Sequence, residues 1–210
     1  MKKISYQGEL GAYSHLACKE AMTDYESVPC RTFEAALNCV REEKADLAMI
    51  PVENSVAGRV ADIHYLLGDY DLKIYAEHFQ EVKHQLLAKK GTTIDEIKFV
   101  RSHSMAIGQC QSAIQRLNLT PIVMADTAGS AKHISEIGTN EDSAIASHLA
   151  AEIYGLEILK SDIQDMKYNT TRFLIMSKGA QQERDEKLSY LTSCISVSYT
   201  HLTLPTNREV

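Results

Sequence analysis

The sequence predicts an α/β fold with mostly parallel sheets. Short apolar segments of strand length alternate with amphipathic helical segments along most of the 210 residues, as in proteins whose helices cover a parallel sheet. Leu47–Ile50 is a continuous apolar run, the pattern of a strand buried on both faces. Because 44% of the residues are hydrophobic and 24% are charged, the chain can bury one large domain or two small lobes.

The first third of the chain begins with a strand at Lys3–Gln7 and a helix at Ser14–Met22. Apolar residues then recur at helical spacing across Thr32–Glu43, which predicts an amphipathic helix with Thr32 as its N-cap. After the buried apolar strand, a further helix is expected across Val60–Leu67, where a glycine follows.

The rest of the chain continues the alternation. Segments rich in β-formers predict strands at Leu72–Phe79, His84–Ala88, Ile97–Val100, Ile122–Ala125, Ser143–Ala146, Leu156–Leu159 and Arg172–Met176. Helices are predicted at Ser104–Leu117, from a cap at Asp126 or Thr127 to Gly138, and in the segment that ends at Tyr154. The sequence contains no internal repeat.

Charge and composition argue against several classes of protein. The net charge of −6 gives no basic face for nucleic acid. The longest apolar runs, such as Leu47–Val52, are too short to span a membrane, and Met1–Lys3 leads into no apolar secretory segment. The five cysteines form no CxxC pair, which predicts reduced thiols in a cytoplasmic protein. The eight histidines have no metal-like spacing, so we predict no metal site.

The first candidate ligand-binding segment is Gly8–Ser14 (GELGAYS), between a strand and a helix. Its glycines let the backbone approach a ligand, and the start of the helix offers N–H groups to an anion. The segment lacks the third glycine of a dinucleotide fingerprint, so a simple tight turn explains it better when it is taken alone.

The second candidate is Pro51–Val60 (PVENSVAGRV), at the carboxyl end of the buried strand, where open α/β folds place ligands. Glu53, Asn54 and Ser55 bring an acid, an amide and a hydroxyl side by side there. Asn54 or Ser55 can also simply cap the following helix, and the two roles are compatible.

The third candidate is Asn169–Phe173 (NTTRF), which leads into an apolar strand. Its threonines can be no more than β-branched residues at a strand start. Arg172 needs a partner beside that strand, and a substrate carboxylate would fit its guanidinium. Ser102 and Gln109 form the remaining candidate; Gln109 flanks an apolar helical stripe and can face a cleft, although a solvated glutamine is the commoner outcome.

Six segments follow one another in a recognisable order: YQGELGAYSHLA, PVENSVAGRVAD, RSHSMAIGQC, ADTAGSA, AIAS–LAAEIYGLEIL and IQD–NTTRF. This run of motifs resembles that of the prephenate dehydratases over Ile4 to about Ser177, and ENS and TRF at this separation are specific. The chain departs from the family at His103-Ser104-Met105, where His-Pro-Gln is frequent.

The resemblance implies a two-lobed architecture similar to type II periplasmic binding proteins, with the active site in the cleft between the lobes. Residues 1–180 would be the catalytic domain, with lobe one at about 1–76 plus 169–180 and lobe two at about 77–168. The implied site residues are the catalytic Thr171 and Glu53 and the substrate-binding Gly11, Ser14, Asn54, Ser55, Ser102, Gln109, Arg172 and Phe173.

The implied reaction converts prephenate into phenylpyruvate with loss of carbon dioxide and water. It needs no cofactor, because formation of the aromatic ring drives it. The family assigns catalysis to the threonine of TRF, here Thr171. A threonine hydroxyl is too weak an acid to be the proton source, so we expect it to polarise the departing hydroxyl or to relay a proton. Glu53 is the alternative acid, provided that its site is dry enough to raise its pKa.

The resemblance also implies a homodimer or homotetramer and, usually, a C-terminal ACT domain that binds phenylalanine. Here 181–197 would be a linker with at most the start of such a domain, and 198–210 would be a non-native or disordered tail. We therefore expect regulation by phenylalanine to be lost. Two alternatives remain open: a non-catalytic two-lobed binding protein for an aromatic or carboxylate ligand, and a homologue silenced by Ser104 and Met105 or by truncation.

Overall fold

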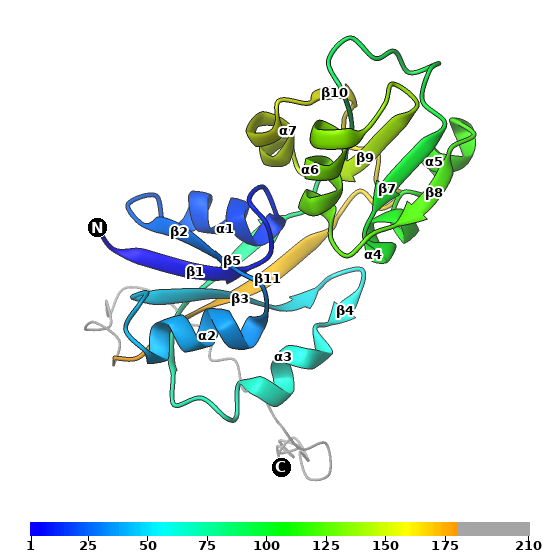
Figure 1. The fold of residues 1–210 in the computed structure, drawn as a ribbon. Helices are drawn as coiled ribbons and strands as arrows, with labels where there is room; N and C mark the ends of the chain where they lie inside the picture. The colour runs from blue at the N-terminus through cyan, green and yellow to red at the C-terminus, as the bar shows by residue number, and fades with distance from the viewer. Residues whose placement is uncertain (180–210) are drawn as a thin grey trace, which may run out of the picture.

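The first of two sheets gathers strands from both ends of the chain (Figure 1). The structure is a computed structural model that describes residues 1–179, apart from the side chain of residue 64. The strand order is β2-β1-β3-β11-β5, and the short β4 pairs with β3. The strands are β1 (Lys3–Gln7), β2 (Glu26–Cys30), β3 (Leu47–Asn54), β4 (Gly58–Arg59), β5 (Lys73–Glu81) and β11 (Thr170–Ser177).

Three helices accompany this sheet: α1 (Tyr13–Ala21), α2 (Phe33–Arg41) and α3 (Ala61–Leu66). Helices α1 and α2 pack on opposite faces, because alternate residues of β3 and β11 join two different apolar clusters, one with α1 and one with α2 and α3. The side chain of Thr32 accepts a hydrogen bond from the Ala35 backbone N–H, so the predicted N-cap of α2 is confirmed.

The second sheet has the order β10-β6-β9-β7-β8 and forms the second lobe. Its strands are β6 (Gln85–Ala88), β7 (Phe99–Ser102), β8 (Thr120–Val123), β9 (Asp142–Ala146) and β10 (Glu157–Lys160). The helices are α4 (Ser104–Gly108), α5 (Gln111–Arg116), α6 (Thr127–Ile137) and α7 (His148–Tyr154). Two apolar clusters again cover opposite faces of the sheet, one with α4 and α5 and one with α6 and α7.

The predicted α/β class and the two lobes are confirmed, but both sheets are mixed rather than mostly parallel. Strand β1 runs parallel to β2 and β3, and β7 runs parallel to β8 and β9. In contrast, β11 is antiparallel to β3 and β5, and β6 is antiparallel to β9 and β10. Strands β11 and β6 each arrive from the other lobe. Each therefore begins beside the carboxyl ends of the parallel strands in its sheet.

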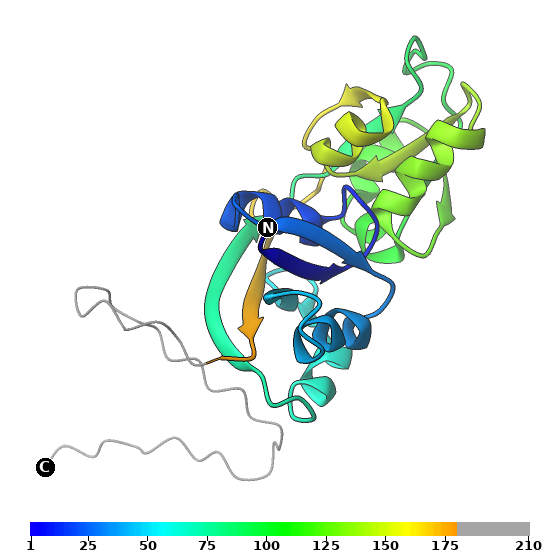
Figure 2. The same cartoon turned by 60° about the vertical axis from the view of Figure 1, so that its left-hand side comes forward.

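The lobe boundary lies later in the chain than the sequence suggested. Strand β5 pairs with β11 as far as Glu81, so residues 77–81 belong to the first sheet rather than the second, and the chain returns to the first sheet at Thr170. Figure 2 shows β5 and β11 side by side in the first lobe. The two segments that join β5 to β6 and β10 to β11 are therefore the only crossings between the sheets within residues 1–179.

Other differences have local causes. The helix predicted at Ser104–Leu117 is two helices, because the chain breaks at Gln109, whose carbonyl accepts a hydrogen bond from the Asp165 N–H at 2.7 Å. Strand β2 was missed because its sequence, ESVPC, has no apolar run; its proline is tolerated because β2 is an edge strand.

The segments 181–197 and 198–210, with the possible ACT strand and the suspected tail, lie outside the described residues. Within residues 1–179, no helix is long and apolar enough to cross a membrane.

Candidate active site

A cavity of about 460 Å³ lies between the two lobes and is lined from both. The first lobe contributes Ser14, Asn54 and Thr171, and the second contributes His103 and Gln109. The carboxyl ends of β1 and β3 open into this cavity, as expected of ligand sites in α/β folds. The active site expected in the inter-lobe cleft therefore has a matching cavity.

Asn54 ends β3 and is held in one orientation by the turn that follows it. Its Oδ1 accepts hydrogen bonds from the backbone N–H groups of Val56 at 2.9 Å and Ala57 at 2.8 Å. The Nδ2 side of the amide therefore faces β11, where it donates to Thr171 Oγ1 at 3.0 Å and to Asn169 Oδ1 at 2.7 Å. The asparagine of ENS thus caps a turn and also fixes a hydrogen-bond donor toward Thr171 and Asn169.

Thr171 lies directly opposite Asn54 in the pairing of β11 with β3. Its hydroxyl oxygen accepts from Asn54, and no hydrogen bond from that hydroxyl to another described residue competes for its proton. Because Thr171 lines the cavity, its O–H can donate to a ligand there.

The hydrogen-bonded chain continues across the cleft. Asn169 Nδ2 donates to Gln109 Oε1 at 2.9 Å, and the same oxygen lies 2.8 Å from His84 Nε2. His84 Nδ1 then lies 2.9 Å from the hydroxyl of Tyr13. Burial lowers the pKa of His84, so its ring is neutral at neutral pH. We call this set (Tyr13, His84, Gln109, Asn169, Asn54 and Thr171) the amide chain.

Five of the predicted site residues meet in the cavity. Besides Asn54, Thr171 and Gln109, these are Ser14 at the start of α1 and Phe173 on β11. Phe173 is 1% exposed, so it provides an apolar floor rather than a polar contact. Thr171 and Phe173 share a face of β11 because side chains alternate along a strand.

Three other predicted residues do not line the cavity. Glu53 is exposed, so the dry site that its role as an acid required is not present. Ser55 Oγ accepts from the Thr170 backbone N–H at 3.0 Å and so joins the loop after β3 to β11. Ser102 is fully buried and donates to the Ile145 carbonyl at 2.7 Å, which joins β7 to β9.

Arg172 also lies away from the cavity, because it falls between Thr171 and Phe173 on the other face of β11. Its Nε donates to Glu77 Oε2 on β5 at 2.7 Å, and the two side chains are only 21% and 24% exposed. The partner that the sequence required for this guanidinium is therefore a protein carboxylate.

Gly11 serves the contact between the lobes instead of the cavity. A Cβ at this position would lie 2.7 Å from the Ala150 Cα of α7, and the backbone φ is +87°. Its carbonyl accepts from Ser147 Oγ at 2.5 Å, and the neighbouring Leu10 carbonyl accepts from the Tyr154 hydroxyl at 2.9 Å. The GELG turn is thus held against the start of α7.

Substitution of Gly11 by alanine should destabilise the protein by about 2–5 kcal/mol, because left-handed strain of about 1–2 kcal/mol adds to overpacking of about 1–3 kcal/mol. Gly58→Ala is the matched control: its φ is +81°, but nothing lies within 4 Å of a new Cβ. Denaturant unfolding gives the loss of stability in each variant. The loss in Gly58→Ala reports backbone strain alone, and the extra loss in Gly11→Ala reports overpacking. Equal losses of stability would contradict the close contact between Gly11 and Ala150.

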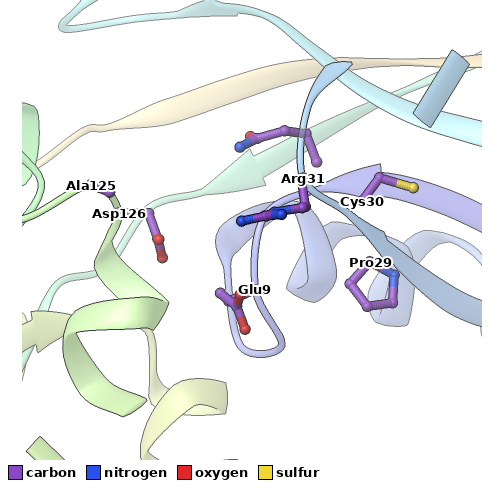
Figure 3. A pocket seen from close by; sticks show the side chains of 8 residues that line it. Glu9, Pro29, Cys30, Arg31, Ala125 and Asp126 are labelled. Carbon is purple, nitrogen blue, oxygen red and sulfur yellow. The ribbon is translucent and has the colours of Figure 1, made fainter. Parts of the chain in front are cut away.

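A second hollow of about 390 Å³ adjoins the cavity and shares four lining residues with it, Gln7, Gly8, Ala125 and Asp126. Figure 3 shows Arg31, at the end of β2, beside Glu9 and Asp126 in this hollow. Sequence reasoning missed Arg31, because no motif marks it. Its guanidinium is exposed and lines the hollow, so it is a candidate anion donor in place of Arg172.

Among residues 1–179, no group of three or more His, Cys, Asp or Glu side chains could hold a metal ion. The four described cysteines, Cys18, Cys30, Cys39 and Cys110, are free.

Comparison with known proteins identifies one family. The sequence model of the prephenate dehydratases matches residues 4–181. A bifunctional N-acyl-homoserine lactone acylase/prephenate dehydratase of Komagataeibacter europaeus is 46% identical over 83% of this chain and 62% of its own length. An arogenate dehydratase/prephenate dehydratase of Arabidopsis thaliana is 40% identical over 84% of this chain and 46% of its own length. The chain thus spans about half to two thirds of these relatives.

Solved structures agree with this result. The prephenate dehydratase of Arthrobacter aurescens in complex with L-Phe has a TM-score of 0.80 and 30% identity, over 87% of this chain and 62% of that one. A quorum-quenching acylase, GqqA, has a TM-score of 0.80 and 45% identity, over 85% of this chain and 65% of that one.

Proposed function

The chain belongs to the prephenate dehydratase family, and from this premise we propose that it converts prephenate into phenylpyruvate, carbon dioxide and water in the biosynthesis of phenylalanine. The observation that carries the proposal is the match of the family over residues 4–181. The amide chain supports it, because it leaves a hydroxyl and an amide available to a ligand in the cavity between the lobes.

The reaction consumes one proton. The bond from the ring to its carboxylate breaks and releases carbon dioxide, and its electron pair moves through the ring diene. The bond to the ring hydroxyl on the opposite carbon then breaks. That hydroxyl leaves as water after it receives the proton, and the ring becomes aromatic. The protein therefore has to hold two carboxylates, assist a departing hydroxyl and keep water from the ring carboxylate.

Thr171 is proposed to donate a hydrogen bond to the departing hydroxyl. Its oxygen already accepts from Asn54, so its own proton is directed to the ligand. This donation stabilises the negative charge that develops as the bond breaks, without requiring the threonine to ionise. His103 also lines the cavity, and its Nδ1 accepts from the Met105 backbone N–H at 3.3 Å. With Nδ1 as an acceptor, the ring hydrogen lies on Nε2, from where it can donate a second hydrogen bond to the departing hydroxyl.

The carboxylates are proposed to meet the NH₂ group of Gln109, the backbone at the start of α1 and the guanidinium of Arg31. Helix α1 has no side-chain cap, so its first N–H groups are open to an anion. Phe33, Val60 and Phe173 add apolar wall on the first-lobe side. An apolar wall disfavours the hydrated ring carboxylate more than the neutral carbon dioxide that it becomes.

The remaining proposals concern the whole protein: a cytoplasmic location and assembly as a homodimer or homotetramer. The first is supported by the free described cysteines. The second rests on the family, and light scattering of the purified protein tests it.

Turnover of prephenate tests the function. We expect the purified chain to form phenylpyruvate at a rate that saturates with prephenate, and a parallel assay with arogenate shows which side chain on the ring the cavity prefers. Binding of prephenate without turnover would instead support the non-catalytic binding protein or the silenced homologue.

Arg172→Lys should lower stability by about 1–3 kcal/mol, because a point charge does not reproduce the guanidinium contact with Glu77. Glu77→Gln should have a similar effect from the other side of the pair. Both variants should keep KM for prephenate within about twofold of the unsubstituted protein, since neither group lines the cavity. A large rise of KM in Arg172→Lys alone would place the guanidinium at the substrate.

A further inference from the structure

The orientation of every side-chain amide in the amide chain follows from one backbone turn. The N–H groups of Val56 and Ala57 can only donate, so the atom of Asn54 that faces them must be Oδ1. Nδ2 of Asn54 then faces Asn169, so the facing atom of Asn169 must be its oxygen. Nδ2 of Asn169 therefore faces Gln109, and the facing atom there must be Oε1.

The same reasoning determines the tautomer of His84. Gln109 Oε1 can only accept, and it lies 2.8 Å from His84 Nε2, so this nitrogen must carry a proton. Burial lowers the pKa of His84 and keeps the ring neutral, which leaves Nδ1 as an acceptor. Burial also keeps the pKa of Tyr13 well above its usual value, so the Tyr13 hydroxyl retains a proton to donate to Nδ1.

The hydrogen bonds of Tyr13, at the other end of the amide chain, are consistent with this assignment. The Tyr13 hydroxyl also lies 2.9 Å from the Lys83 carbonyl, but it has a single proton. The Lys83 carbonyl receives a second donor, Nε2 of Gln85 at 3.2 Å. It therefore stays satisfied when Tyr13 donates to His84.

Gln109 is the residue at which this fixed order of donors and acceptors reaches the cavity. Its Oε1 accepts from two side chains, whereas its Nε2 makes no hydrogen bond to any residue in 1–179. Gln109 lines the cavity, so the group left for a ligand is an NH₂ donor. Asn169 and His84, each only 2% exposed, are too deeply buried to reorient freely.

We propose that Asn169 and His84 are positioning residues: they fix the Gln109 amide with its NH₂ group toward the ligand, and His84 does so as the Nε2–H tautomer. The site thereby favours a hydrogen-bond acceptor such as a carboxylate at this position, because a reversed amide would present an oxygen to it. The part of this inference that concerns the carboxylate of prephenate rests on the proposed function.

Asn169→Asp is the sharpest test, because it changes one donor into an acceptor with almost no change of shape. The carboxylate still accepts from Asn54 but can no longer donate to Gln109. The Gln109 amide has to turn so that its NH₂ faces residue 169 and His84, and His84 then becomes the Nδ1–H tautomer. Asn118→Asp, at an exposed position, adds the same charge as a control.

Nitrogen-15 NMR of protein labelled at histidine distinguishes the two tautomers directly. His84 is assigned through the loss of its signals in His84→Gln, or through ring-to-backbone correlations if that variant does not fold. We expect a neutral Nε2–H ring in the unsubstituted protein and in Asn118→Asp, and an Nδ1–H ring in Asn169→Asp. An Nδ1–H ring in the unsubstituted protein overturns the inference, as does an unchanged tautomer in folded Asn169→Asp.

Steady-state kinetics test the consequence for the ligand. Asn169→Asp should raise KM for prephenate about tenfold to a hundredfold, the loss expected for a hydrogen bond to a charged group, with a smaller effect on kcat. His84→Leu should raise KM, and His84→Gln, which restores an N–H, should recover most of the loss. Equal KM values for these two variants would oppose a positioning role. If the unsubstituted chain does not turn prephenate over, the proposed function fails, whereas the tautomer result is unaffected.

Discussion

Thr171→Val should lower kcat for prephenate by about a hundredfold or more and leave the protein folded. Valine keeps the shape and the β-branching of threonine on β11 but removes the hydroxyl. Loss of one positioned donor to a developing negative charge costs on the order of a hundredfold to a thousandfold in kcat. KM should change much less, because the hydroxyl contact strengthens as the bond to the departing hydroxyl breaks.

Two variants control for this experiment. Thr170→Val makes the same change one residue earlier, at a side chain that does not line the cavity, and should keep nearly normal kcat. Thr171→Ser restores a hydroxyl that can accept from Asn54 and should recover much of the activity. If Thr171→Val and Thr170→Val have equal kcat, the hydroxyl of Thr171 has no part in the reaction.

Gln109→Glu should raise KM for prephenate by about a hundredfold to a thousandfold. Its carboxylate still accepts from Asn169 and His84, so the amide chain and the fold are retained. The NH₂ group, however, becomes a negatively charged oxygen that faces an anionic substrate. Two like charges about 4 Å apart near a protein surface repel by about 4 kcal/mol, which outweighs the neutral hydrogen bond that is lost.

Gln115→Glu is the control for charge, because it adds the same carboxylate to α5 at an exposed position. It should keep KM within about twofold of the unsubstituted protein, since exposed charges at a distance are screened. A KM for Gln109→Glu that matches this control would mean that the anion does not meet Gln109.

Much of the fold could be predicted because its elements carry local signals. The run LAMI identified the buried centre of β3, and the helical spacing after Thr32 identified α2 and its cap. Strand β2 carries no such signal, and the antiparallel course of β11 and β6 depends on where the chain crosses between lobes. That crossing is a long-range property, which periodicity along the sequence does not record.

The site could likewise be predicted only in part, because only some of its residues stand in local motifs. Asn54, Thr171 and Gln109 stand in motifs, and Tyr13 lies within the candidate segment Gly8–Ser14, whereas His84 stands in a segment that reads only as a strand. The partner of Arg172 could not be predicted: the need for one is visible in the sequence, but the identity of that partner, Glu77, depends on the pairing of β5 with β11.

Release of the ring carboxylate is the most direct test of the proposed reaction. Prephenate labelled with carbon-13 in that carboxylate is incubated with the purified chain, and carbon-13 dioxide and phenylpyruvate are measured together. We predict that both appear at one common rate, one molecule of each for every prephenate consumed, and that Thr171→Val slows both equally. The account would be contradicted if the folded protein consumed labelled prephenate no faster than prephenate decays spontaneously.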